Sequence, residues 1–153
     1  MLRIVPIDRG DTKNVTKNDY KYMSKARHIA EFSDYGSIRH GCVAVYKGHI
    51  IGTGYNTNKT HPMQLYYNRF REITGSMTPK LHAEINCLNQ IRHLDIDFKK
   101  VKLYIYRSRN DRAYSLSRPC PSCMAAIKDL GIRNIYYTTD NGYANEKILE
   151  VAA

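Results

Sequence analysis

The stretches Leu81-His82-Ala83-Glu84-Ile85 and Arg118-Pro119-Cys120-Pro121-Ser122-Cys123 decide how the rest of this chain is interpreted. They supply one imidazole, two thiols and one carboxylate that is not needed as a ligand. Three nitrogen and sulfur ligands leave a tetrahedral zinc ion with one open position, as in catalytic zinc sites. The expected ligands of one catalytic zinc ion are His82, Cys120 and Cys123. Glu84 is then free to move protons to and from a zinc-bound hydroxide.

The C-x-x-C motif is also typical of two other kinds of site. Alone, this motif also suits a thioredoxin-like redox pair or half of a structural zinc site. A redox pair would leave His82-Ala83-Glu84 without a purpose. A structural zinc site would need a fourth ligand at finger-like spacing, and the sequence offers no obvious one. The catalytic zinc ion therefore explains more of the sequence than either alternative.

The order H-x-E followed by P-C-x-x-C is the signature of zinc-dependent nucleobase deaminases. From about residue 18 to 150 the chain resembles the zinc-dependent cytidine/deoxycytidylate deaminase superfamily. The resemblance implies an α/β fold with three α/β/α layers, a central five-stranded mixed sheet and zinc at the N-termini of two helices. We expect one deaminase domain over residues 1–153, with an N-terminal arm at 1–16 and a catalytic core at 17–151.

The composition is typical of a globular domain, and the positive net charge favours an anionic partner. Hydrophobic residues make up 42% and charged residues 25% of the 153 residues, which is ordinary. The net charge of +10 suits a nucleotide phosphate or a nucleic acid, although a merely basic surface would give the same value. No apolar run is long enough for a signal peptide or a membrane span. With Cys42 and Cys87 expected in the core rather than in disulfides, we expect a cytoplasmic protein.

The first half of the chain predicts a helix and a hairpin. A short strand is expected at Leu2–Pro6, and Asn18-Asp19 predicts the cap of a helix that runs to about Phe32. Two β-rich runs at 41–46 and 49–55, joined by Lys47-Gly48, predict a β-hairpin.

The region after this hairpin contains two expected substrate contacts. In deoxycytidylate deaminases a Gly-Tyr-Asn here leads into the substrate loop, so the resemblance implies that Asn56 contacts the sugar or its phosphate. A plain turn residue is the alternative for Asn56. Residues 57–80 form either a functional loop or a short helix against the core. His61, within this region, is either a substrate contact or a surface group.

The second half predicts alternating helices and strands. Helices are expected from His82 to His93 and from Pro121 to Leu130, and strands at 101–106, 133–138 and 143–151. The turn signal Asp140-Asn141-Gly142 predicts that the last strand returns antiparallel. Free-nucleoside cytidine deaminases have such a hairpin, whereas deoxycytidylate, tRNA adenosine and polynucleotide cytidine deaminases usually have a parallel last strand. This mixture leaves the substrate open.

A basic extension at 107–118 separates the middle strand from the cysteine motif, and many family members lack it. It would place Arg118 at the mouth of the pocket, where an arginine can clamp phosphate. The resemblance also implies that the backbone N–H of Ala83 binds the base carbonyl. An idle surface loop is the alternative for the extension.

The expected reaction is hydrolytic deamination of a free cytosine nucleotide or nucleoside, above all dCMP to dUMP, by attack of zinc-bound hydroxide with Glu84 as the proton shuttle. The alternative is a deaminase acting on cytosine in single-stranded DNA or RNA, because the Tyr-rich and basic loops would suit a strand. A purine substrate and a non-enzymatic descendant that keeps zinc for folding are further alternatives. The resemblance implies a homo-oligomer.

Overall fold

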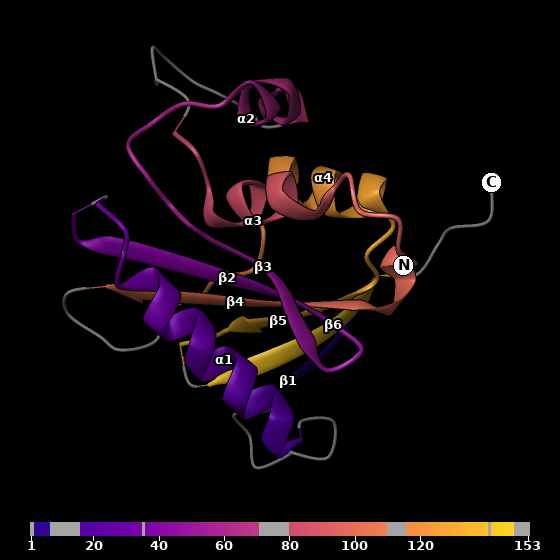
Figure 1. The fold of residues 1–153 in the computed structure, drawn as a ribbon. Coiled ribbons are helices and arrows are strands. Elements are labelled where there is room, and N and C mark those ends of the chain that lie inside the picture. Colours follow the sequence, from indigo (N-terminus) through magenta and orange to yellow (C-terminus); the bar gives the residue numbers. More distant parts are fainter. Residues whose placement is uncertain are drawn as a thin grey trace.

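A computed structural model describes residues 2–6, 16–34, 36–70, 80–109, 116–140 and 142–148. The described chain forms three layers (Figure 1). Helix α1 covers one face of a mixed sheet, and helices α3 and α4 cover the other. Helix α2 packs on the outside of α3 and α4. The α/β/α architecture expected from the sequence is therefore confirmed.

The five expected strands form the central mixed sheet, and a sixth strand is added at one edge. The strand order is β1-β6-β5-β4-β2-β3, and β4 with β5 is the parallel pair among the described strands. The additional strand is the short one expected at Leu2–Pro6, which pairs antiparallel with β6. Residues 2–6 are therefore part of the sheet and not a separate arm. This sixth strand forms because the edge of β6 is otherwise unpaired and can accept hydrogen bonds from residues 2–6.

The described elements follow the chain in the expected order. The strands are β1 Leu2–Pro6, β2 Ile38–Tyr46, β3 His49–Tyr55, β4 Val101–Arg109, β5 Asn134–Thr138 and β6 Tyr143–Ile148. The helices are α1 Lys17–Ala30, α2 Pro62–Tyr67, α3 Ala83–Ile91 and α4 Pro121–Leu130, with short 3₁₀ helices at Asn68–Phe70 and Phe98–Lys100.

Helix α1 begins earlier than the sequence analysis placed it. Thr16 is the N-cap, and its hydroxyl accepts from the backbone N–H of Asp19 at 3.2 Å. The carboxylate of Asp19 accepts in return from the backbone N–H of Thr16 at 2.9 Å. This reciprocal pair is a capping box, so the prediction that Asn18-Asp19 caps the helix was wrong by two residues. Asp19 is instead the third helical residue.

Alternate side chains along the central strands point to opposite faces of the sheet, so the hydrophobic core has two parts. Cys42 and Ala44 of β2 pack towards α3 and α4, whereas Val43 and Val45 pack towards α1. Successive side chains of a strand point to opposite faces, so both faces of the central strands are apolar. Cys87 lies in the core with Cys42, and both are free buried thiols as expected.

The predicted turns form where the backbone needs a left-handed conformation. Lys47 and Gly48 have φ angles of 49° and 80°, which a two-residue hairpin turn of this hand requires. Gly131 ends α4 at φ 100°. Strand β6 pairs antiparallel with β5, which confirms the expected hairpin; Asn141 and residues 149–151 lie outside the described residues.

The basic extension contains more strand than expected. Strand β4 continues to Arg109 because it pairs with β2 as far as Ile38. Residues 116–120 are described as irregular chain leading into α4, and 110–115 lie outside the described residues. Across the described chain, none of the helices has the length and apolar character that crossing a membrane requires.

Candidate metal centre

Two helices begin at the predicted zinc ligands. His82 is the N-cap of α3, and Cys120 is the N-cap of α4. Neither residue makes a side-chain capping bond, so both side chains are available for another purpose. The positive ends of two helix dipoles therefore meet at one place, which favours thiolate and hydroxide there.

The chain places the three ligand atoms at distances that suit zinc. Nδ1 of His82 lies 3.3 Å from Sγ of Cys123 and 3.5 Å from Sγ of Cys120. All three donor atoms lie within 4.8 Å of one another. Bonds of about 2.3 Å to sulfur and 2.0–2.1 Å to nitrogen separate such ligands of a tetrahedral zinc by about 3.5 Å. The donor set and its spacing therefore fit one zinc ion, as predicted.

The surroundings shift the pKa values of the two ligand thiols in opposite directions. A hydrogen bond from Cys123 lowers the pKa of the Cys120 thiol to about 3. Burial raises the pKa of the Cys123 thiol well above its usual range. The hydroxyl of the fully buried Ser122 lies 3.0 Å from Sγ of Cys120, where it can donate to a thiolate. Cys120 is thus ready to bind a cation as a thiolate, and Cys123 gives up its proton when the metal binds.

Glu84 lies beside these ligands in the first turn of α3. Its side chain is 5% exposed, and Oε1 is buried without a hydrogen-bond partner among the described residues. Burial raises the pKa of the Glu84 carboxyl, while the positive charge of His82 lowers it by a smaller amount. An unpartnered buried carboxylate oxygen is costly, so its persistence indicates a functional group rather than a packing one.

Three residues expected to contact the substrate are Asn56, His61 and Ala83, and each has a structural role in the fold. The amide of Asn56 accepts from the backbone N–H of His40 at 2.8 Å and donates to the carbonyl of Ile38 at 3.1 Å. His61 is the N-cap of α2, and its Nδ1 accepts from the backbone N–H of Met63 at 3.1 Å. Ala83 is buried as the first residue of α3. The side chain of Asn56 therefore continues the pairing of β3 with β2 just beyond the end of β3, and His61 starts a helix.

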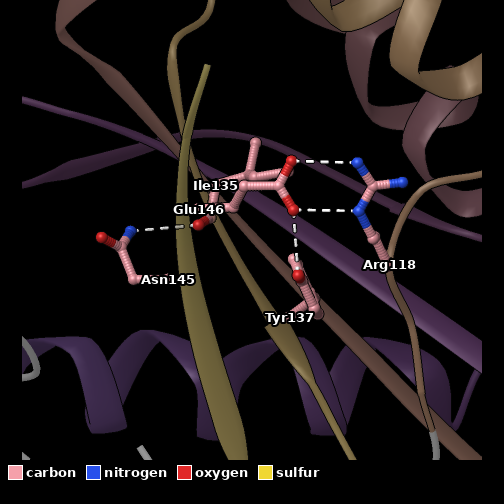
Figure 2. Close-up of polar contacts among 5 residues, drawn as sticks. All are labelled: Arg118, Ile135, Tyr137, Asn145 and Glu146. Atoms are coloured by element: carbon pink, nitrogen blue, oxygen red, sulfur yellow. Dashed lines mark hydrogen bonds and ion pairs between the residues drawn. The ribbon is translucent and has the colours of Figure 1, made fainter. Parts of the chain in front are cut away.

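Arg118 is already engaged by a carboxylate. Its Nε and Nη2 donate to the two carboxylate oxygens of Glu146 at 2.9 and 3.1 Å (Figure 2). The same carboxylate accepts from the phenol of Tyr137 at 2.9 Å. Its expected role as a phosphate clamp would require Arg118 to bind a second anion with the guanidinium atoms that remain.

Two residues that the sequence motifs do not include support the site from a distance. Gln64 of α2 is fully buried, and its Oε1 accepts from the backbone N–H of His82 at 2.9 Å. Its amide nitrogen donates to Oδ1 of Asn68 at 2.7 Å. Because no local pattern links a glutamine to a histidine eighteen positions away, the only sequence signal was a polar residue in an apolar stretch.

His40 is a second missed residue near the ligands. Burial, with smaller contributions from the charges of Arg107 and His82, lowers its pKa to about 3. Its Nε2 is buried and accepts or donates no hydrogen bond within the described chain. A neutral imidazole therefore lies close to the metal centre. A lone histidine in a strand gives no signal of this placement.

Comparison with known families identifies the domain. The model of the cytidine and deoxycytidylate deaminase zinc-binding region matches residues 16–139, which include all three ligands and Glu84. The chain belongs to the cytidine and deoxycytidylate deaminase family. This is a family of hydrolytic enzymes, and the match covers most of the described fold.

Individual relatives of this deaminase-family chain are distant. The tRNA-specific adenosine deaminase subunit tad2 of Schizosaccharomyces pombe is 27% identical over 144 residues, which are 90% of this chain but 31% of that relative's length. A dCMP deaminase of cyanophage S-TIM5 is 21% identical, with a TM-score of 0.54 over 77% of this chain and 79% of the phage protein. Cytidine deaminase of Burkholderia pseudomallei is 12% identical, with a TM-score of 0.58 over 84% and 91%. The two structural likenesses show the shared fold.

Proposed function

We propose that the protein catalyses the hydrolytic deamination of a free cytosine nucleotide or nucleoside, with dCMP converted to dUMP as the preferred reaction. The observation that carries this proposal is the buried, unpartnered Oε1 of Glu84 beside His82, Cys120 and Cys123. A zinc ion held for structure alone would not need this carboxylate. The unpartnered oxygen of Glu84 can accept a hydrogen bond from a substrate or a water molecule.

In the proposed reaction, Glu84 moves the protons. His82, Cys120 and Cys123 would hold a zinc ion, which would lower the pKa of water and so make hydroxide available at neutral pH. Glu84 takes the proton that the attacking water releases and delivers it to the ring nitrogen of the base. Burial raises its pKa, which favours the protonated form that the delivery step requires. Glu84 then takes the proton of the new hydroxyl group on the ring carbon and passes it to the departing amine, so that water and cytosine give uracil and ammonia.

The backbone and two polar side chains orient the substrate in this proposal. Ala83 is the first residue of α3, where a backbone N–H has no partner within the helix, so it can donate to the base carbonyl. His61 accepts at Nδ1, which leaves its proton on Nε2 as a donor for phosphate. Asn56 uses one amide N–H for Ile38 and has a second one for a sugar hydroxyl.

A polynucleotide substrate is the second candidate. Two observations favour it: the net charge of +10, and a relative whose name is that of a tRNA-specific adenosine deaminase subunit. Under this alternative the protein deaminates cytosine in single-stranded DNA or RNA. Binding of many phosphates weakens steeply with salt, whereas binding of one phosphate weakens little.

The decisive experiment is a deamination assay by mass spectrometry with zinc-loaded protein. Cytidine, deoxycytidine, their monophosphates and a single-stranded oligonucleotide are tested separately, each at low and high salt. Glu84→Ala is the control, because it should keep zinc and lose turnover. Turnover of free deoxycytidylate with weak salt dependence supports the first candidate.

Other outcomes of this assay separate the alternatives. Turnover of the oligonucleotide alone, lost at high salt, would replace the first candidate with the second. Equal turnover by the Glu84→Ala variant would contradict the proton-shuttle role. If zinc-loaded protein turned over none of the cytosine substrates, both candidates would be contradicted. Adenine and guanine substrates would then be tested.

We further propose that the protein works in the cytoplasm as a homo-oligomer. Leu65 and Tyr66 of α2 support the assembly, because they are 55% and 51% exposed on the outer helical layer. Light scattering coupled to gel filtration tests the oligomeric state. A monomeric mass at micromolar concentration would contradict it.

A further inference from the structure

The segment that leads into the cysteine motif is held to the sheet by side chains. Residues 116–120 have no helical or strand structure, yet Cys120 must be placed accurately for metal binding. The backbone N–H of Ser117 donates to the carbonyl of Thr138 at 2.9 Å, and its hydroxyl donates to the carbonyl of Ile105 at 2.9 Å. Ser117 therefore fixes the segment to the middle of β4 and to the end of β5.

One residue later, a buried carboxylate fixes the same segment to β6. Glu146 is fully buried, and it lies opposite Ile135 on the face of the sheet that carries the metal centre. The guanidinium of Arg118 reaches it with two parallel hydrogen bonds of 2.9 and 3.1 Å (Figure 2). Such a bidentate pair restricts both position and orientation, which a single hydrogen bond does not.

The remaining side of the carboxylate is held from β5. The phenol of Tyr137 donates to Oε1 of Glu146 at 2.9 Å, the same oxygen that accepts from Nε of Arg118. A buried charge persists only when it is paired and hydrogen-bonded. The fold therefore maintains a charge inside the sheet, and the one cation that neutralises it within the described contacts lies two residues before Cys120.

We propose that Glu146, acting through Arg118, is a positioning residue for the zinc ligand Cys120. The ion pair holds the segment 118–120 against β6 so that the sulfur of Cys120 meets His82 and Cys123 before the metal arrives. This inference rests on metal binding and does not depend on the substrate. It also assigns Arg118 a task that differs from the phosphate contact expected from its sequence position.

The test compares the rate of zinc loss among variants. Zinc-loaded proteins are mixed with a coloured chelator, and metal transfer is followed at a temperature where each variant is folded. Glu146→Gln keeps the shape of the side chain and removes its charge. Arg118→Gln removes the other partner, and Arg118→Lys keeps the charge but not the fork geometry.

We expect Glu146→Gln and Arg118→Gln each to lose zinc about tenfold faster, as outer-shell partners of metal ligands commonly do. The double variant should lose zinc no faster than the faster single variant, because both changes break one interaction. Arg118→Lys should fall between. The absorption spectrum of cobalt-substituted Glu146→Gln should shift, which reports altered ligand geometry independently of activity.

A matched control separates positioning from general instability. Tyr104→Phe removes a buried phenol whose hydroxyl donates to Asp19 at 2.5 Å, on the face of the sheet that packs against α1. It should lower the thermal midpoint without changing the rate of zinc loss. Zinc loss at the unaltered rate in either Glu146→Gln or Arg118→Gln would overturn the proposal. Equal acceleration in Tyr104→Phe would overturn it too.

Discussion

At the scale of single residues, the metal centre depends on polar side chains that are buried away from it. Gln64 holds the backbone of His82, Ser122 lies against the sulfur of Cys120, and Glu146 holds the segment before it through Arg118. Groups of this kind fix the orientation of the ligands, and their removal typically lowers metal affinity about 10–100-fold.

The thiol of Cys120 should be required for metal binding. Cys120→Ala leaves two ligands, so we expect purified protein to lose its zinc, measured by elemental analysis. Cys42→Ala is the matched control, because Cys42 is also a free cysteine but lies in the core without a metal contact. A full zinc complement in Cys120→Ala would contradict the assignment of the ligand set.

The amide of Gln64 should stabilise the fold as well as the site. Gln64→Leu leaves the backbone N–H of His82 and the side-chain Oδ1 of Asn68 without their partner, at a cost of about 1–3 kcal/mol in unfolding free energy. Gln90→Leu is the control, because Gln90 also accepts from a backbone N–H, that of Thr53 at 3.2 Å, but is exposed. Chemical denaturation measures both; equal losses would show that burial of the glutamine is not the cause.

At the scale of elements, helix α3 reaches the metal centre because it packs unusually close to β3. A Cβ added to Gly54 would lie 2.4 Å from the carbonyl oxygen of Ala83 and 2.5 Å from the backbone nitrogen of Cys87. The backbone of a helix cannot give way as a side chain can. Asn86 adds a hydrogen bond of 3.1 Å from its amide to the carbonyl of Tyr55. The first turn of α3, with His82 and Glu84, is thereby fixed over the end of β3.

Gly54→Ala should therefore separate α3 from the sheet. We expect a loss of about 1–3 kcal/mol or more in unfolding free energy, together with weaker zinc binding, because overpacking moves the helix. Gly52→Ala is the matched control on the same strand, since its Cβ would meet only Cγ2 of Ile91, at 2.6 Å, as the first contact. That contact is with a side chain and not with the helix backbone, so Gly52→Ala should cost less than Gly54→Ala. Equal destabilisation of both variants, measured by urea unfolding, would contradict this explanation.

At the scale of the whole molecule, the face packed against α1 contains a stack of buried tyrosines. The rings of Tyr104 and Tyr136 are parallel within 9° at a centroid distance of 4.6 Å. Burial raises the pKa of Tyr136 to about 12 and that of Tyr104 further. On the other face, burial also raises the pKa of Tyr137.

Stability should consequently fall at alkaline pH. A phenol whose pKa is raised in the folded state stabilises the fold fully below its unfolded value of about 10, and this contribution is lost as pH rises through about 12. We expect the urea midpoint to decrease steadily across that window. Tyr136→Phe should reduce the slope by removing one titrating group. An unchanged midpoint up to pH 12 would show that the phenols ionise without cost.

The metal ligands, one hairpin turn and one helix end could be predicted from short stretches of sequence. The ligands and Glu84 follow from two short motifs, the hairpin turn from Lys47-Gly48, and the end of α4 from Gly131. These features depend on a few neighbouring residues whose chemistry or φ angle allows little else. The family followed from the same two motifs.

The tertiary structure decided what distant residues do. The sixth strand forms because an open edge of β6 accepts the chain start, and Arg118 finds Glu146 twenty-eight positions away. Gln64 reaches His82 because α2 folds back over α3. Sequence alone thus determined the chemistry of the metal centre, since each ligand carries its own donor atom. Its support depends on long-range contacts, which have no local pattern and arise only when the layers pack.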